Sequence, residues 1–281
     1  MRNRESGVVL INVLVILALT ASVVHVMISL SEQAITRSQR FSAAGQAQAL
    51  ISAGEASAIT ALRRDMVEAG QADHEGEPWA LVGQTPVPIE GGSFALRIED
   101  AQAKFNLNSL PISGALGLQI LQRIVAALEM SPDVTSRIAA RMTRPAELER
   151  LSDLVAEAGL TTLEVAELAK LVTALPGSTP INISTAPPAL LAALASNPVQ
   201  ARLLESTRTR QGFLTPDDVA DAKMVLPPGA GFASRFFWMT VTVELDGTRQ
   251  TMRSLLQRGA AANGRPAVLV IARERADLPE F

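Results

Sequence analysis

The sequence predicts an α+β protein. A long N-terminal transmembrane helix packs on a mostly antiparallel sheet of about four strands, and a large all-α segment is inserted into the sheet. An apolar run near the N-terminus continues into helix-forming residues, with no proline before Pro78. Strand-like alternation occurs in residues 91–100 and resumes only after residue 234, and the residues in between have helical spacing.

Composition excludes several classes of protein. Of the 281 residues, 48% are hydrophobic and 19% are charged, which allows one large or two modest domains with a sizeable core. Cysteine is absent, so thiol catalysis, disulfides and Cys-ligated zinc are excluded. The two histidines, His25 and His74, are far apart in the sequence and leave little for a metal site or a catalytic triad. The net charge of −3 lacks the basic bias of a nucleic-acid-binding protein.

The run from Val8 to Leu30 is the predicted transmembrane helix. It contains no Asp, Glu, Lys or Arg, and at about 1.5 Å per residue it can cross a hydrocarbon core of about 30 Å. Arg2 and Arg4 precede it, so the positive-inside rule places the N-terminus in the cytoplasm and the rest of the chain outside. A cleaved secretory signal has a shorter apolar core of about 7–15 residues. A plain signal anchor would explain the length but gives Gly7 no role.

Residues 31–69 predict a helical stem that continues the membrane helix. They are rich in Ala, Gln, Glu and Arg, which are good helix formers. Ile51, Ala58, Leu62 and Met66 fall on one face of such a helix. An unbroken helix of roughly 60 residues would be about 90 Å long, with one half in lipid and the other packed on a globular head.

Strand patterns lie on both sides of the insertion. Phe94, Leu96 and Ile98 alternate with less apolar residues in 91–100, and further strands are predicted at 235–245, 248–258 and 266–274. Asp246-Gly247 is a hairpin turn signal. We expect the strands before and after the insertion to pair.

The insertion, residues 111–234, is predicted to be helical, with subdomains at about 112–180 and 181–234. Each predicted helix starts at an N-cap residue or a proline. The helices are expected at 115–130, 131–142, 144–159, 161–175, 185–196, 197–211 and 215–223.

Gly7, placed between a basic leader and the apolar run, resembles the junction of type IV pilin-like proteins. Four further segments, in this order, are similar to the K-type minor pseudopilins of type II secretion. They are RIEDAQAKFNLNSL (97–110), LPGSTPINISTAPPALLAAL (175–194), QGFLTPDDV (211–219) and TVTVELDGTRQTMRSLLQR (240–258). The resemblance implies a pilin-like head from residues 70–110 and 235–281, with a SAM-like or helix-hairpin-helix-like insertion.

The resemblance also implies processing at the N-terminus. A prepilin peptidase would remove residues 1–7 by cutting between Gly7 and Val8, and would methylate Val8. Position five of the mature chain is then Asn12. Most pilins have a glutamate there, which neutralises the terminal amine of a neighbouring subunit. Loss of that glutamate is a mark of the K type, which is believed to cap the filament.

The motif residues have expected structural roles, and we expect no catalytic residue and no cofactor. Asn106, Asn108 and Asn182 can close turns through side-chain-to-backbone hydrogen bonds. Thr185, or its neighbour Ser184, can cap the helix that Pro187 and Pro188 pre-organise.

Many K-type proteins bind calcium through an acidic loop in the insertion, and this chain departs from that pattern. The matching stretch, residues 136–154, contains four arginines and no clustered Asp, whereas calcium needs about six to eight oxygen ligands. We therefore expect no calcium site of the family type and no other metal site. Asp217, Asp218 and Asp221 are expected to complement a helix N-terminus.

The resemblance implies a minor pseudopilin that joins I- and J-type partners in a tip complex, which primes and caps the pseudopilus. It would be a single-pass protein of the inner membrane with its head in the periplasm, in contact with prepilin peptidase and the inner-membrane assembly platform.

Three other functions remain open. One is a minor pilin of a type IV pilus. Another is a membrane-anchored DNA-binding protein, since residues 181–224 are similar to a helix-hairpin-helix unit. Its hairpin at Ser196-Asn197-Pro198 lacks the usual glycines, and the charges of residues 178–226 balance, so we expect no nucleic-acid partner. An enzyme is the third, although no catalytic or phosphate-binding motif is present.

Overall fold

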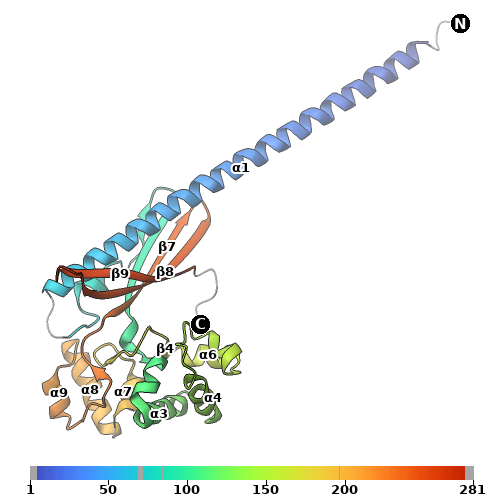
Figure 1. The fold of residues 1–281 in the computed structure, drawn as a ribbon. Coiled ribbons are helices and arrows are strands. Elements are labelled where there is room, and N and C mark those ends of the chain that lie inside the picture. The colour runs from blue at the N-terminus through green and yellow to red at the C-terminus, as the bar shows by residue number, and fades with distance from the viewer. Residues whose placement is uncertain (1–4, 69–71, 84, 196, 276–281) are drawn as a thin grey trace.

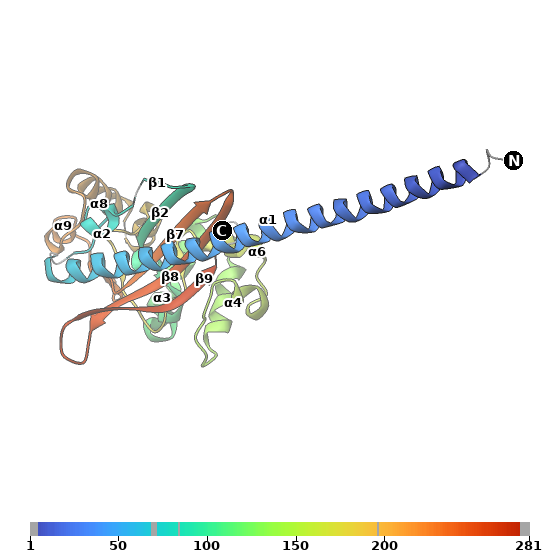
Figure 2. The same cartoon turned by 90° about the horizontal axis from the view of Figure 1, so that it is seen from above.

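The computed structural model describes residues 5–68, 72–83, 85–195 and 197–275, with only the backbone for residues 5–9 (Figure 1). Figures 1 and 2 show three layers: the long helix α1, a sheet beneath its C-terminal part, and a group of short helices on the other side of the sheet. The predicted α+β architecture is confirmed.

Helix α1 (Glu5–Glu68) is continuous over 64 residues, which corresponds to about 96 Å at 1.5 Å per residue. Its side chains are exposed from Leu10 to Ser42, apart from the half-buried Ser29. From Ala43 onward, side chains at helical spacing are buried against the head. The expected continuity of the membrane run and the stem is therefore confirmed. Residues 1–4 of the predicted leader lie outside the described residues.

The main sheet is antiparallel and holds five strands. In spatial order they are β1 (Val87–Ile89), β2 (Gly92–Asp100), β7 (Phe236–Leu245), β8 (Thr248–Ala260) and β9 (Pro266–Arg275). Strands β2 and β7 pair along their whole length, so the predicted pairing across the insertion is confirmed. Asp246 and Gly247 turn between β7 and β8 with φ angles of 49° and 75°, as the hairpin signal predicts. The sequence did not indicate β1, which is too short to show alternation.

The stem packs on the sheet through one apolar core. Ala47, Ile51, Ala58 and Leu62 of α1 meet Met239, Val241 and Val243 of β7, together with Leu96 and Ile98 of β2. Gly54 lies on the same face of α1, and a Cβ atom there would be only 2.8 Å from Val241 Cγ2. Glycine thus lets the helix approach the sheet closely.

The insertion forms a second core. Its helices are α3 (Leu110–Ala127), α4 (Asp133–Met142), α5 (Asp153–Glu157), α6 (Thr162–Leu168), α7 (Pro188–Leu194), α8 (Pro198–Gln211) and α9 (Pro216–Asp221). Leu121, Ile124, Ile138 and Leu154 are fully buried among them. Helix α3 is kinked at Gly114, whose φ of 56° and ψ of −133° suit glycine.

Two helix predictions in the insertion are wrong over part of their length. The helix expected at 144–159 is present only as α5, because the buried Arg141 holds the backbone carbonyls of Ala146 and Glu147 in a loop. The helix expected at 161–175 ends at Leu168, because the following residues form a strand. That strand belongs to one of two short parallel pairs, β3 (Phe105–Asn106) with β4 (Val172–Thr173) and β5 (Ile181–Asn182) with β6 (Ala230–Gly231).

Candidate assembly interface

The N-terminal part of α1 presents an exposed apolar surface. Its large hydrophobic side chains from Leu10 to Leu30 are about half exposed or more, for example Val13 at 47% and Met27 at 65%. This part of α1 is long and apolar enough to cross a membrane, and none of its apolar window is buried. A second helical segment, Leu107–Ala127, passes the same test, but 33% of its window is buried, within the insertion. The first segment is suited to anchoring the protein in a membrane.

The predicted processing residues lie at the start of this surface. Gly7 and Val8 fall in the first turn of α1. Asn12 and His25 are exposed farther along the same helix. Asn12 and His25 lie outside the part of α1 that the head covers, which begins near Ala43.

A polar contact ties the middle of the stem to the edge of the sheet. Glu55 of α1 accepts hydrogen bonds from Arg273 Nε at 2.9 Å and Nη2 at 2.7 Å, and from Ser254 Oγ at 3.2 Å. The hydrogen bond from Arg273 is the main reason that the pKa of Glu55 lies below its usual value. This contact fixes the stem relative to β8 and β9.

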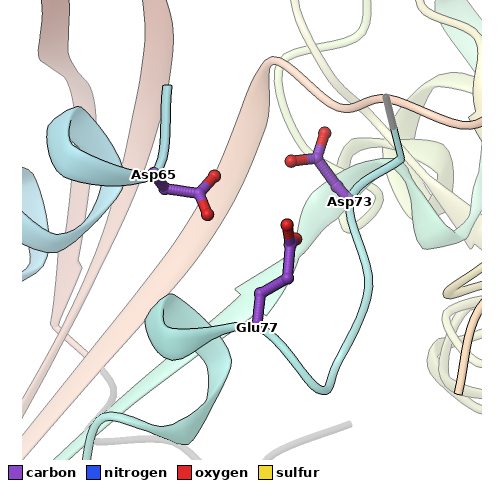
Figure 3. Close-up of side chains that lie close together, drawn as sticks. All are labelled: Asp65, Asp73 and Glu77. Atoms are coloured by element: carbon purple, nitrogen blue, oxygen red, sulfur yellow. The ribbon is translucent and has the colours of Figure 1, made fainter. Parts of the chain in front are cut away.

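Three buried carboxylates meet at the C-terminal end of α1 (Figure 3). They belong to Asp65 of α1, Asp73 of the following loop and Glu77, which precedes α2 (Pro78–Leu81), and their oxygens lie within 4.8 Å of one another. Arg258 of β8 donates to Asp65 Oδ2 and to Asp73 Oδ1. Trp79 Nε1 donates to Glu77 Oε2 at 2.8 Å.

One guanidinium thus pairs with two of the three clustered acids. Burial, and then the negative charge of Glu77, raise the pKa of Asp65 to about 6, although Arg258 opposes this shift. Three carboxylates could in principle hold a hard cation. Here Arg258 already lies against two of them, so the cluster has an internal cation.

A second acid, the half-buried Asp100, lies where the sheet meets the insertion. Asp100 Oδ2 accepts from Thr185 Oγ1 at 2.5 Å, Ser234 Oγ at 2.7 Å and Asn182 Nδ2 at 2.8 Å. Burial raises the pKa of Asp100 to about 6, and the hydrogen bonds only partly offset this. Ser234 also links Asp100 to the cluster of three carboxylates. Its hydroxyl donates to Asp100, its N–H donates to Asp73 Oδ2, and its carbonyl accepts from Arg258.

We call this set the joint: Asp65, Asp73, Glu77, Asp100, Asn182, Thr185, Ser234 and Arg258. Among these residues, sequence motifs pointed only to Asn182 and Thr185. One signal for the others was present, since Arg258 follows the buried Leu256 by two residues in a strand and therefore faces the core. A charge at such a position needs a buried partner.

The motif residues organise the loops of the insertion. Asn106 Oδ1 accepts from the N–H groups of Asn108 and Leu175, which closes a turn and attaches a distant loop. Asn108 bonds in turn to both backbone groups of Leu148. Asn182 Oδ1 accepts from the Ser184 N–H in a similar turn.

The capping role expected of Thr185 is wrong. Helix α7 has Pro187 at its N-cap and no side-chain cap. Thr185 donates instead to Asp100, because a buried carboxylate needs hydrogen-bond donors more than an accessible helix end does. Ser184 also bonds elsewhere, to the backbone of Leu214.

A buried arginine holds the loop that follows α4. Arg141 is 3% exposed, and it donates to Glu157 and to the carbonyls of Ala146 and Glu147. The prediction for the acidic stretch at 217–221 is confirmed for Asp217 and Asp218, which lie in the first turn of α9. It is wrong for Asp221, which is the last residue of that short helix and lies at its C-terminal end.

The hairpin considered for DNA binding has its own structural role. Asn197 Oδ1 accepts from the Val199 N–H at 2.8 Å and so caps α8. Ser196 lies outside the described residues.

Comparison with known proteins identifies a curated relative and a similar fold among solved structures. No protein-family model matches the chain. Type II secretion system protein K of Pseudomonas aeruginosa is 30% identical over 302 residues, covering 92% of this chain and 90% of that protein. A chain in the crystal structure of the GspK-GspI-GspJ complex from the type 2 secretion system of enterotoxigenic Escherichia coli has a TM-score of 0.65 and 21% identity. The match covers 86% of this chain and 99% of that one, and it shows a shared fold.

Proposed function

The chain belongs to the type II secretion system protein K family and is a minor pseudopilin of that system; from this premise we propose that it joins I- and J-type minor pseudopilins in a tip complex. That complex primes and caps the pseudopilus for protein export across the outer membrane. The similar chain of enterotoxigenic E. coli was crystallised in a complex with GspI and GspJ.

One observation carries the proposal, and it is the division of α1 into two halves. The apolar half is free to pack among other membrane helices, while the other half is covered by the sheet. The insertion lies at the end of the molecule away from the N-terminus (Figure 1). A subunit of this shape can enter a filament through α1, while the insertion blocks addition of another subunit above it.

The proposal includes processing and placement. Residues 1–7 are the leader, 8–30 the membrane helix and 31–69 the stem. Residues 70–110 and 235–281 form the head around the insertion of 111–234. Prepilin peptidase cuts after Gly7 and methylates Val8, and the assembly platform of the inner membrane then receives the subunit. The head lies in the periplasm, and the protein acts by assembly rather than by catalysis.

Mass spectrometry of the intact protein tests the processing. We expect loss of residues 1–7 and one methyl group on Val8 when the protein is produced with prepilin peptidase, and neither change without it. Gly7→Leu is the control, because a bulky side chain at the cut should leave the chain unprocessed. A Met1 N-terminus in the presence of an active peptidase contradicts the proposal.

Deletion of the insertion tests the capping role. Residues 111–234 are replaced by a short linker, and pseudopilus length is measured by electron microscopy. We expect long filaments of unregulated length. The deletion variant must still purify with its I- and J-type partners, which shows that its stem and sheet are folded. Filaments of normal length from such a variant would contradict the capping role of the insertion.

A further inference from the structure

A continuous series of hydrogen bonds, buried or partly buried, connects the stem, the sheet and the insertion. Asp65 of the stem bonds to Arg258 of β8, and Arg258 bonds to the carbonyl of Ser234. The hydroxyl of Ser234 bonds to Asp100 at the end of β2, and Asp100 bonds to Thr185 of the insertion. Every link of this series lies within the joint.

The two acids in this series, Asp65 and Asp100, lack a full complement of positive charge. Asp65 faces Asp73 and Glu77 from the loop after α1 and Arg258 from β8, and this one cation pairs with Asp65 and Asp73, so the cluster has more negative charge than the cation can balance. Asp100 receives its hydrogen bonds from the hydroxyls of Thr185 and Ser234, the amide of Asn182 and the N–H of Gln102. All of these donors are uncharged.

We propose that the joint is sensitive to protons: it holds the insertion firmly to the stem and sheet when Asp65 and Asp100 are protonated, and it loosens when they are ionised. Enclosing a carboxylate without a cation is costly, and so is placing a third carboxylate beside two that already share one guanidinium. A proton on each acid removes that cost.

The groups around Asp100 can form hydrogen bonds with both the ionised and the protonated carboxyl group. Thr185 Oγ1 lies 3.4 Å from the carbonyl of Asn182 as well as 2.5 Å from Asp100. Its hydroxyl can therefore turn toward that carbonyl and accept a hydrogen bond from a protonated Asp100. No side chain has to leave the site. Protonation therefore changes how strongly the joint holds the insertion, while the arrangement of its residues stays the same.

The direction of the pH effect follows from the pKa values. Those of Asp65 and Asp100 rise from 3.8 to about 6 in the folded chain. Between these values the folded state binds more protons than the unfolded state, so the free energy of unfolding falls as the pH rises. The stabilisation is complete below pH 3.8 and is lost as the pH passes through about 6.

The test uses the full-length chain in detergent micelles, with urea unfolding followed by fluorescence. Trp79 is buried and bonded to Glu77 of the joint, so its emission reports on the joint. Trp238→Phe removes the second tryptophan. Between pH 5 and pH 7.5 we expect the unfolding constant to rise by about tenfold for each of the two acids.

Asp65→Asn and Asp100→Asn separate the contributions. Each substitution should remove one factor of about ten from the rise of the unfolding constant between pH 5 and pH 7.5. Asp221→Asn, at an exposed position on α9, is the matched control and should retain the full dependence. The amide oxygen of the Asp65→Asn variant can still accept a hydrogen bond from Arg258, so this variant should fold. It therefore tests the proposal even if the Asp100→Asn variant does not fold. An equal unfolding constant at both pH values, or a full dependence in Asp65→Asn, overturns the proposal.

Hydrogen exchange measured by mass spectrometry locates the effect. Peptides that cover residues 181–186 should lose protection at pH 7.5 relative to pH 5, after correction for intrinsic exchange rates. Peptides from helix α4 should keep theirs, because they lie away from the joint. Unchanged protection of residues 181–186 would count against loosening of the insertion.

Discussion

Ser234 Oγ donates a 2.7 Å hydrogen bond to Asp100 Oδ2, and the two residues mark the points at which the chain re-enters and leaves the sheet. Asp100 is the last residue of β2, and Ser234 lies just before β7. A single side-chain contact thus fastens both connections to the insertion.

Ser234→Ala should lower the free energy of unfolding by about 1–3 kcal/mol, because a buried carboxylate loses a donor. The same change also removes a partner of Asn182. Urea unfolding of the full chain, followed by Trp79 fluorescence, measures the loss. Ser57→Ala is the control, since that exposed hydroxyl bonds only within α1. Equal stabilities of the two variants would show that the contact contributes little.

Gly54→Ala and Gly45→Ala should have opposite effects, although both replace a glycine in α1. A Cβ at position 54 would lie 2.8 Å from Val241 and 3.1 Å from Phe94, whereas position 45 has nothing within 4 Å. Alanine favours a helix by about 1 kcal/mol over glycine, which should appear as stabilisation at position 45. Overpacking at position 54 should cost about 1–3 kcal/mol. Urea midpoints measure both effects, and stabilisation by Gly54→Ala contradicts the close approach.

The contact between Glu55 and Arg273 should stabilise the stem at neutral pH and fail in acid. The pKa of Glu55 is lowered in the folded chain, so its contribution is present above the ordinary value of 4.5 and is lost as the pH falls through the folded value. Because the Arg273 side chain is 56% exposed, we expect a coupling energy of only about 0.5 kcal/mol.

A double-mutant cycle with Glu55→Gln and Arg273→Met, run at pH 7 and at pH 3, measures this coupling. The exposed pair of Arg97 and Glu99 provides the control cycle, which should give a value near zero. A Glu55 coupling of equal size at both pH values would contradict the assignment.

Arg141→Met should destabilise the insertion by about 1–3 kcal/mol, because it leaves two loop carbonyls without their buried donor and removes the partner of the exposed Glu157. Thermal unfolding followed by circular dichroism measures the loss, and Arg144→Met, at an exposed position close by, is the control. If this guanidinium holds the loop, neither calcium nor a chelator should change the midpoint of the unmodified chain. A rise on adding calcium would reveal a metal site that the sequence does not predict.

The strands of the sheet, their hairpin turn and the long helix α1 could be predicted from short stretches of the sequence. The alternation of Phe94, Leu96 and Ile98 and the turn at Asp246-Gly247 predicted the strands and their hairpin, because side-chain period and turn chemistry are properties of a few adjacent residues. The continuity of α1 was predicted in the same way, from its helix-forming residues and from the absence of proline within it.

Contacts between distant residues were not predictable in this way. Asp65 and Arg258 are separated by 193 positions in the sequence, and no spacing rule connects them. The loop at Ala146 has helix-forming residues, but Arg141 captures its carbonyls and overrides that propensity. Thr185 has the residue type of a helix cap, yet tertiary burial of Asp100 decides its role.

The pairing of β2 with β7 also has a consequence for the order of folding. Asp100 opposes Phe237, so the two strands form a hairpin whose connection is the entire insertion. Closing so long a loop in an unfolded chain is slow. Once the insertion has collapsed around its own core, its two ends are already neighbours, and β2 can pair with β7 at little further entropic cost. We therefore expect the insertion to become protected first in a pulse-labelling experiment, and the sheet to close afterwards.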